Sequence, residues 1–409
     1  MTKIKYILIA ILMGTTFYSF AQTGISSPYS RFAFGMQHDN SPVAYRAMGG
    51  VSFGMRSNRV INPLQPASYT ACDSMTFMFD AAARVGWTRY EDATGMKNKA
   101  DGNLDYVSLQ LPIWRQHIAF SAGLLPFSSC GYDLVLKDVI PSSNYTYTAQ
   151  FTGEGGLTEV YAGLSGNLFD WVALGFNFYY MFGDTENSRS LTFDNASISS
   201  MVRASILDIS TVRFRYGLQL FHTFKDHKFV LGGVLEHPMK VKGSYVEMSA
   251  TYLDTVFVAN NGMNLPWVYG IGGSYTWKNS LTIGIDFERQ LWGRTTFMAQ
   301  EPAYEVKLRN ANRLALGFEY RHNPMGKNYA ERISWRAGVS YRNSYVSAMP
   351  MQDWRVSIGL GFPLRNAGTN FNVAIEYIHR GSKSTLREDG LQMTINAAIR
   401  ELWFFKRKI

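Results

Sequence analysis

The sequence predicts an all-β protein, a transmembrane antiparallel β-barrel of about 14 strands, with 12 to 16 possible, and an N-terminal plug inside its lumen. Three observations lead to this fold class. Apolar and polar side chains alternate with a period of two in many segments, aromatic residues make up 15% of the 409 residues while charged residues make up only 17%, and no run of 18 apolar residues follows the export signal. A bilayer tolerates no unpaired backbone groups, so an exported chain that spans it without such a run must form a closed barrel. A soluble all-β protein is the alternative that composition alone leaves open.

The first segment has the pattern of a signal peptide. Lys3 and Lys5 give a basic start, an apolar stretch follows over 6–20, and Ser19-Phe-Ala21 is a small-x-small cleavage site. No cysteine follows the apolar stretch, which argues against a lipoprotein anchor. We therefore predict a signal peptide at residues 1–21 and a location in the bacterial outer membrane.

Residues 22–71 are predicted to form the plug, because their centre, 47–68, shows neither a helix period nor a strand period. Three glycines within 49–54 loosen the backbone there, and two prolines within 63–66 each remove a hydrogen-bond donor. A segment with prolines at these positions cannot form the middle of a ladder. The candidate plug residues are Met48, Gly49, Gly50, Asn62, Pro63 and Pro66.

Residues 72–409 are predicted to form the barrel wall. In Met75–Trp87 the odd positions are apolar and the even positions include Thr76, Asp80 and Arg84, so one set faces lipid and the other the lumen. The alternation recurs at 145–151, 172–180, 212–220, 267–277, 281–287, 335–341, 356–362 and 371–377, and the last strand is predicted at 391–399. Turns are predicted near 167, 278–279, 365–368 and 388–390, and longer external loops at 91–103, 183–190 and 321–331. At about 24 residues per strand and connection, this wall holds about 14 strands.

The formal net charge of +9 does not indicate a nucleic-acid partner, because Lys and Arg are scattered singly along the chain. Such groups suit the phosphates of outer-membrane lipid and lipopolysaccharide, which we expect as partners. The two cysteines, Cys72 and Cys130, could form a disulfide in an oxidising compartment, but two buried small hydrophobic residues are the favoured interpretation.

No motif for catalysis or metal binding is present. The seven histidines have no metal-ligand spacing, and the sequence contains no GxSxG, P-loop or dinucleotide-binding motif. We therefore expect no enzyme activity, no metal site and no cofactor. Charged pairs within strands, such as Asp80 with Arg84, are predicted to satisfy one another in the lumen.

Short motifs in the plug and at both ends resemble the FadL-type outer-membrane transporters, and more closely their Bacteroidetes branch with its PorV-like relatives. Ala47-Met-Gly-Gly50 followed by Ile61-Asn-Pro63 is similar to the family's N-terminal hatch, although Leu64 and Gln65 follow here and the second proline and alanine come at Pro66-Ala67. The other motifs are Ser27–Phe32, Gly359–Pro363 and Trp403–Ile409.

The resemblance implies two functions from different classes. A FadL-like transporter would pass hydrophobic small molecules through a plugged lumen. A relative of the PorV type would be a non-transporting structural or docking subunit of an envelope machine, in type IX secretion or barrel assembly, with other subunits of that machine as partners. Transport is the favoured function, and the subunit of an envelope machine is the alternative. A lumen closed by side chains, with apolar loops outside, would favour the second function, and an apolar pocket at the plug would favour the first.

The resemblance also implies a lateral window, because FadL-type barrels have an inward kink in the third strand. The third predicted strand, His117–Pro126, is followed closely by a further glycine, and its window candidates are Gly123, Pro126 and Gly131. The favoured alternative is that Pro126 ends the strand and begins an external loop through Ser128 and Ser129.

Overall fold

The computed structural model of the chain describes residues 27–91, 95–140, 145–195, 197–249, 254–260, 262–297, 307–324, 326–347, 351–364, 369–381 and 386–402. The predicted signal peptide at 1–21 and the terminal motif at 403–409 lie outside these residues.

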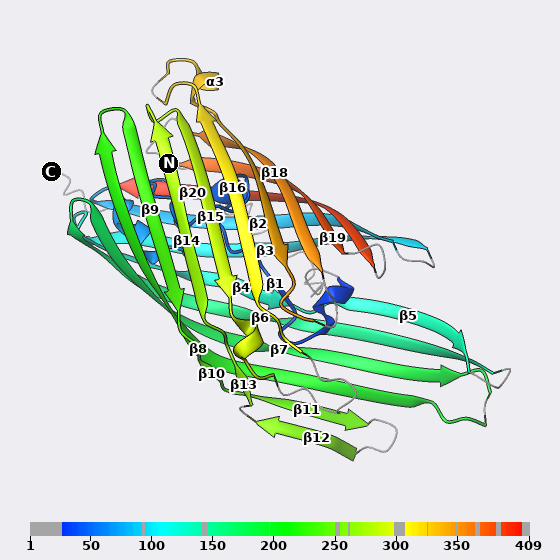
Figure 1. Cartoon of the computed structure of the whole chain (residues 1–409). Helices are drawn as coiled ribbons and strands as arrows, with labels where there is room; N and C mark the ends of the chain where they lie inside the picture. Colours follow the sequence, from blue (N-terminus) through cyan, green and yellow to red (C-terminus); the bar gives the residue numbers. More distant parts are fainter. Residues whose placement is uncertain are drawn as a thin grey trace, which may run out of the picture.

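Fourteen antiparallel strands close into a barrel, as the sequence predicted (Figure 1). The first and last wall strands pair along their whole length, from Thr76 opposite Leu402 to Glu91 opposite Arg387, which completes the ring. The wall strands are β2 (Thr76–Glu91), β3 (Met96–Trp114), β4 (Ile118–Ser129), β6 (Thr146–Phe169), β7 (Val172–Phe193), β8 (Met201–Phe224), β9 (His227–Glu236), β14 (Val268–Trp277), β15 (Leu281–Gln290), β16 (Ala311–Arg321), β17 (Ser334–Asn343), β18 (Gln352–Pro363), β19 (Asn370–Gly381) and β20 (Arg387–Leu402).

The two faces of each strand meet different surroundings, which explains the period of two in the sequence. In β15, Ile283, Ile285 and Phe287 are exposed on the outer surface, whereas Asp286 and Glu288 are buried on the inner one. The outer surface of the barrel is accordingly a band of large apolar side chains, which suits lipid. The predicted register is therefore confirmed in these strands.

Tight turns join the strands at one end of the barrel. The β14–β15 connection is the three residues 278–280, in which Lys278 and Asn279 both have positive φ, 50° and 52°, as in a type I′ turn. Arg115 and Lys225 occupy the corresponding turns after β3 and β8. Since barrels of this class have short periplasmic turns and long external loops, we assign this end to the periplasm.

Four predicted connections are wrong. Most of the predicted loop at 91–103 is the start of β3, which begins at Met96. Residues 183–190 continue β7 and residues 388–390 belong to β20, because strands that extend beyond the lipid keep their pairing while their side chains become polar. The connection at 321–331, which includes α3 (Tyr329–Arg332), joins β16 to β17 at the periplasmic end.

A sheet projects beyond the barrel at the extracellular end (Figure 1, lower right). It consists of the extended ends of β6, β7 and β8 with the added strands β5 (Tyr132–Val139), β11 (Gly243–Ser249) and β12 (Asp254–Asn260). At its base, β10 (Lys240–Val241) pairs with β13 (Met263–Asn264), near the short helix η3 (Trp292–Arg294).

The chain before β2 forms short elements inside the barrel, and we call residues 27–71 the hatch segment. Its elements are η1 (Pro28–Arg31), β1 (Met36–Gln37), α2 (Val43–Arg46) and η2 (Pro66–Ala71). Every residue over 41–55 is buried. Within the described ranges, no helix has both the length and the apolar character needed to cross a membrane.

Candidate functional site

The hatch segment makes a full circuit of the lumen and contacts each of the 14 wall strands. It begins at β20 and β19, where Arg46 meets Thr394 and Glu376. It then passes strand after strand and returns to β3, where Gln110 Nε2 donates to the carbonyl of Tyr69 at 2.9 Å. The segment is therefore seated on the whole inner surface of the wall.

A row of small wall residues forms the seat for the first half of the hatch segment. Ser274, Gly284, Gly317, Gly338 and Ser357 are successive cross-strand partners from β14 to β18. A Cβ atom on either of the last two glycines would overlap the hatch backbone. The serines at the two ends of the row bond to the hatch, since Ser274 Oγ donates to the carbonyl of residue 54 at 2.6 Å and Ser357 Oγ accepts from the amide of residue 49 at 2.8 Å. Small side chains here let the two backbones touch.

The candidate residues Gly49 and Gly50 make a left-handed turn, with φ of 71° and 81°. The turn exposes two carbonyl groups to Arg313, whose Nη2 donates to Gly50 O at 2.8 Å and to Gly49 O at 3.2 Å. Two residues later, Asp286 Oδ2 accepts from the amides of Ser52 and Phe53 at 2.5 and 2.8 Å. Met48 is fully buried against the glycine row.

Asn62, Pro63 and Pro66 position the second half of the segment. Asn62 Nδ2 donates to Ser52 O at 2.8 Å and so ties the two halves together. The carbonyl of Pro63 accepts from Asn177 Nδ2 and from the Tyr179 hydroxyl, both at 2.9 Å. Pro66 starts η2 and packs on the wall glycines Gly175 and Gly217.

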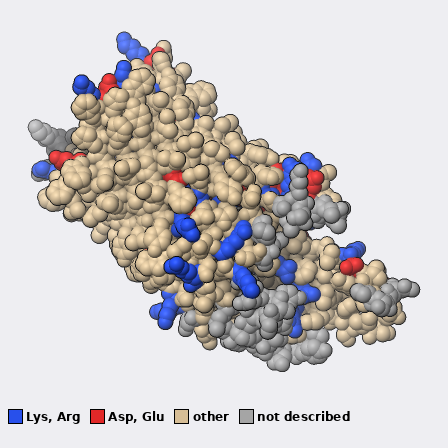
Figure 2. Space-filling view, viewed as in Figure 1, with Lys and Arg blue, Asp and Glu red and all other residues tan. Residues whose placement is uncertain are grey.

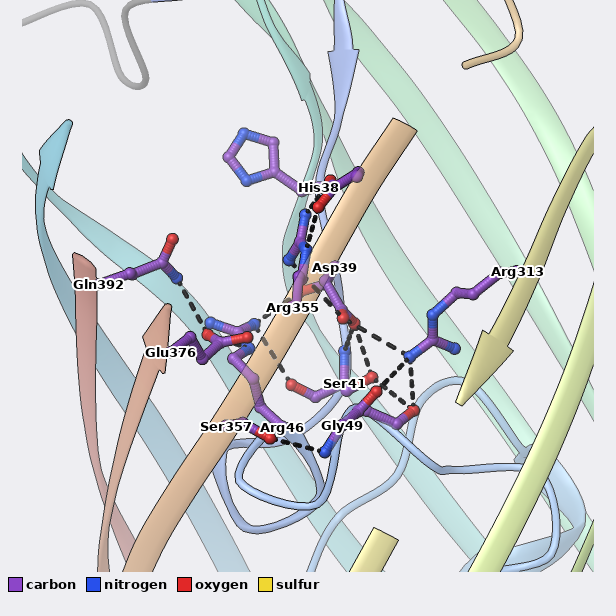
Figure 3. Close-up of polar contacts among 12 residues, drawn as sticks. His38, Asp39, Ser41, Arg46, Gly49, Arg313, Arg355, Ser357, Glu376 and Gln392 are labelled. Carbon is purple, nitrogen blue, oxygen red and sulfur yellow. Dashed lines mark hydrogen bonds and ion pairs between the residues drawn. The ribbon is translucent and has the colours of Figure 1, made fainter. Parts of the chain in front are cut away.

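Buried charges join the hatch segment to the wall (Figure 3). Arg46, which is 1% exposed, pairs with Asp105 of β3 at 2.8 Å and lies 4.0 Å from Glu376 of β19. Its Nη2 also donates to Asp39 O at 2.5 Å. The Asp39 carboxylate lies 3.6 Å from Arg313. These groups come from strands on opposite sides of the barrel, so the network spans the lumen.

The surroundings set the protonation states of two hatch side chains. Burial raises the pKa of Asp39, but the guanidinium groups of Arg313 and Arg355 outweigh burial and hold that pKa well below its ordinary value. Burial and the nearby charge of Arg84 lower the pKa of His38 well below its ordinary value. The network therefore has a charged Asp39 and a neutral His38 at neutral pH.

Two small cavities lie beside the hatch segment. The larger, of about 180 Å³, adjoins hatch residues 31–33 and is lined by aromatic side chains such as Phe151 and Tyr245 together with Arg189. The other, of about 80 Å³, lies between the hatch residues 37–40 and the wall. Arg213, Arg215, Glu236 and Arg313 line it, and Arg213 Nη1 pairs with Glu236 at 2.8 Å. A pocket for a drug-sized apolar ligand typically measures about 300 to 1,000 Å³ and is mostly hydrophobic. This cavity has neither property.

The window candidates lie along β4 and just beyond it. β4 continues through Pro126 to Ser129 with an irregularity after Pro126, so the favoured prediction that Pro126 ends the strand is wrong. β4 separates from β3 at Leu124, and its end pairs with the hatch strand β1 instead. Among the described residues, the part of β3 from 96 to 106 has only β2 as a ladder partner.

The other two window candidates have different surroundings. Gly123 packs tightly, since a Cβ there would lie 2.7 Å from the Tyr161 ring and 2.8 Å from Ser108 Oγ. Gly131 lies beyond the strand and bonds to the hatch segment: its carbonyl accepts from Ser27 N at 2.6 Å and its amide donates to Ser30 Oγ at 3.0 Å.

Some expected pairings take another form. Asp80 and Arg84 do not pair, because four residues along a strand separate two side chains by about 13 Å. Asp80 instead accepts from the Tyr106 hydroxyl at 3.0 Å, and Arg84 lies 3.6 Å from Asp105.

Cys72 and Cys130 are both free and buried, as the favoured interpretation had it. In the described part of the chain, no group of three or more His, Cys, Asp or Glu side chains could hold a metal.

Sequence reasoning missed the wall residues that hold the hatch segment, above all Asp286, Arg313 and the glycine row. Inward-facing glycines in consecutive strands were a visible signal, because Gly284, Gly317 and Gly338 each stand between outward-facing apolar residues. Their alignment into one row depends on the strand register, which a single sequence does not contain.

Comparisons with known proteins agree on the fold. The chain is similar to the toluene transporter TbuX of Ralstonia pickettii, with 13% identity, a TM-score of 0.60, and coverage of 91% of this chain and 99% of that one. It is similar to a FadL homologue of Pseudomonas aeruginosa, with 12% identity, a TM-score of 0.60, and coverage of 90% and 100%. It is also similar to the toluene transporter TodX of Pseudomonas putida, with 14% identity, a TM-score of 0.57, and coverage of 88% and 98%.

The chain thus has the fold of FadL-type outer-membrane barrels. No curated protein matches its sequence. The BamG family model matches residues 3–409, and the chain belongs to the BamG family.

Proposed function

We propose that this protein is a structural or docking subunit of an envelope machine in the bacterial outer membrane, such as a barrel-assembly or type IX secretion complex, and that residues 22–71 act as a plug that keeps its lumen closed. The observation that carries this proposal is the filled lumen: the hatch segment contacts all 14 wall strands, and the cavity of about 80 Å³ beside it is charged. A barrel whose lumen is filled in this way is suited to presenting surfaces.

The energetics of the hatch segment support a permanent plug. Opening the lumen would break the pairs of Arg46 with Asp105 and of Asp39 with Arg313, and leaving a buried charge without its partner costs about 3 to 5 kcal/mol. It would also expose the amides that Asp286 satisfies, at about 1 to 3 kcal/mol for each unsatisfied group. The two cavities beside the hatch segment, of about 80 and 180 Å³, are smaller than the pockets in which an apolar ligand of drug size could recover this free energy.

The low sequence identity to the known transporters also supports the proposal. The transporters share the fold at 12–14% identity, which leaves the function open. The family match is to BamG. The motifs at 27–32 and 359–363 support a place in the Bacteroidetes branch, where PorV-like relatives are docking proteins.

Isolation from native membranes tests the docking function. The tagged full-length chain is extracted in mild detergent, and its partners are quantified by mass spectrometry beside an equally tagged general porin from the same membrane. We expect one or more envelope proteins at a constant molar ratio that the porin does not bring down. A chain that elutes alone, with no partner above the porin level, would contradict the proposal.

Passage of a hydrophobic small molecule is the second candidate function, and the separation of β4 from β3 at Leu124 favours it. An opening between these strands would lead sideways toward lipid, which suits an insoluble ligand, and Gly123, Pro126 and Gly131 would shape it. Replacing Gly123 would disturb Tyr161 and Ser108, so the test uses Pro126→Val alone.

If this route operates, Pro126→Val should reduce uptake of a radiolabelled long-chain hydrophobe into proteoliposomes, because a restored N–H favours continuous pairing. Pro112→Val, a proline replacement in β3 away from the separation, is the matched control. Equal uptake by the wild type and by protein-free liposomes would exclude transport and leave the docking function.

A further inference from the structure

Four basic side chains lie together on the outer surface at the extracellular rim: Lys240, Lys242, Arg289 and Arg294. All four are exposed. Arg289 follows Phe287 on the lipid-facing side of β15, one residue before the strand ends. Lys240 and Lys242 flank Val241, which is fully buried in the inner core, so both lysines point outward.

The backbone pairing places these four residues on adjoining segments of the rim. Lys240 pairs with Asn264, whose amide and side chain both bond to Thr296, at 3.2 and 3.1 Å, and Arg294 lies two residues before Thr296. Arg289 pairs with Tyr269 in the adjacent β14. β14 begins four residues after Asn264, so Arg289 lies on the strand next to the segment that pairs with Lys240.

Among the residues that the structure describes, the four side chains of the basic rim make no ion pair. Asp208 of β8 and its cross-strand partner Asp184 are exposed near Lys242, and neither makes an ion pair with it. Figure 2 shows a group of basic side chains across the middle of this face with no acidic side chain among them.

The height of the basic rim relative to the bilayer indicates its ligand. Trp267 and Tyr269 stack at 5.8 Å beside Arg289, whose cross-strand partner is Tyr269. Amphipathic aromatic rings mark the boundary between the apolar core of the bilayer and its headgroups. Basic side chains just outside that boundary lie at the level of lipid phosphates.

We propose that Lys240, Lys242, Arg289 and Arg294 bind the phosphate groups of lipopolysaccharide, the anionic lipid of the outer leaflet. Several clustered phosphates on one lipid could meet several of these side chains at once, whereas a single phospholipid headgroup meets one or two. The site lies on the outer wall, so it operates whether the barrel docks a partner or passes a ligand.

The test compares two fourfold variants of the full-length protein in detergent. The first carries Lys240→Gln, Lys242→Gln, Arg289→Gln and Arg294→Gln. The second is a matched control at the periplasmic end with the same loss of charge and carries Arg115→Gln, Lys225→Gln, Lys278→Gln and Lys327→Gln. Heat-modifiable migration on gels shows that each variant is folded, and thermal shift with native mass spectrometry measures bound lipopolysaccharide, phosphatidylglycerol and inorganic phosphate.

We expect the rim variant to bind lipopolysaccharide at least about tenfold more weakly than wild type, because each basic group near an anionic surface contributes to attraction. The periplasmic control should bind as wild type does. Equal binding by the rim variant and wild type, or an equal loss in the control, would overturn the site. Binding of phosphatidylglycerol or free phosphate as tight as that of lipopolysaccharide would overturn the identity of the ligand.

Discussion

Gly338 contributes to hatch docking by having no side chain. A Cβ at this position would overlap the backbone at Met48 and Gly49. We expect Gly338→Val to destabilise the protein by about 1 to 3 kcal/mol, the usual cost of overpacking a well-packed site. Gly233→Val is the control on the outer face, where the nearest atom to a new Cβ is 4.0 Å away. Chemical unfolding in detergent measures both, and equal losses would show that the hatch contact is not the cause.

Asp286 supplies the acceptor for two buried amides of the hatch segment, those of Ser52 and Phe53. Asp286→Ala should therefore cost about 1 to 3 kcal/mol for each amide left without a partner. Asp286→Asn keeps one side-chain oxygen and should cost less. Limited proteolysis of the hatch segment should rank wild type, Asn and Ala in order of increasing cleavage, and the reverse order of the two variants would contradict this role.

At the scale of the strand, lipid and headgroup layers divide β7 into two parts. Phe178 is exposed in the apolar band, and Thr192 is exposed on the same face but in the extracellular extension. We expect Phe178→Arg to cost about 2 to 4 kcal/mol near the midplane and Thr192→Arg close to nothing. Refolding titrations in lipid vesicles measure the two free energies. Similar values would mean that the extension also lies in lipid.

The inner face of the wall should also be sensitive to a new arginine. A lumen filled with water would tolerate Arg at Asn177 or Gln219, but both side chains are fully buried against the hatch segment. Asn177 bonds to Pro63 and Tyr69, and Gln219 donates to the carbonyls of Phe53 and Met55. Arg at either position should therefore destabilise the protein as well.

The sequence predicted the wall strands because each has two unlike faces, as in β2, where Phe77 and Val85 face out and Asp80 faces in. The prediction failed in the extracellular extension, where the outer face of the strands no longer meets lipid. Gly183–Ser190 was predicted as a loop because both faces of the extension are polar. The hatch candidates Gly49 and Pro63 were visible as breaks in periodicity. Their partners Asp286 and Asn177 were not, because contacts between residues more than 100 positions apart leave no local pattern.

At the scale of the whole molecule, the hatch segment should be shielded from the cell exterior. Ser52 is fully buried, whereas Ser57 lies at the periplasmic mouth, next to the Arg56 carbonyl that accepts from Lys228 at 3.1 Å. We expect a bulky impermeant maleimide on intact cells to label Ser199→Cys, which is exposed at the extracellular end, and neither Ser52→Cys nor Ser57→Cys.

Permeabilising the outer membrane should then add labelling at Ser57→Cys alone. The native cysteines Cys72 and Cys130 are buried and should give a low background. Labelling of Ser52→Cys from outside, at the rate of Ser199→Cys, would mean that the lumen is open.

The circuit of the hatch segment also constrains how the barrel can be built. The seam between β2 and β20 joins residues 296 to 326 positions apart, yet the segment that touches both strands of that seam is at the start of the chain. The early strands therefore need a partner that is already in place. The hatch segment is available for this role, and successive hairpins can pack around it. Deleting the hatch segment should therefore slow the closure of the barrel as well as open its lumen, because each distant contact must then form without a local guide.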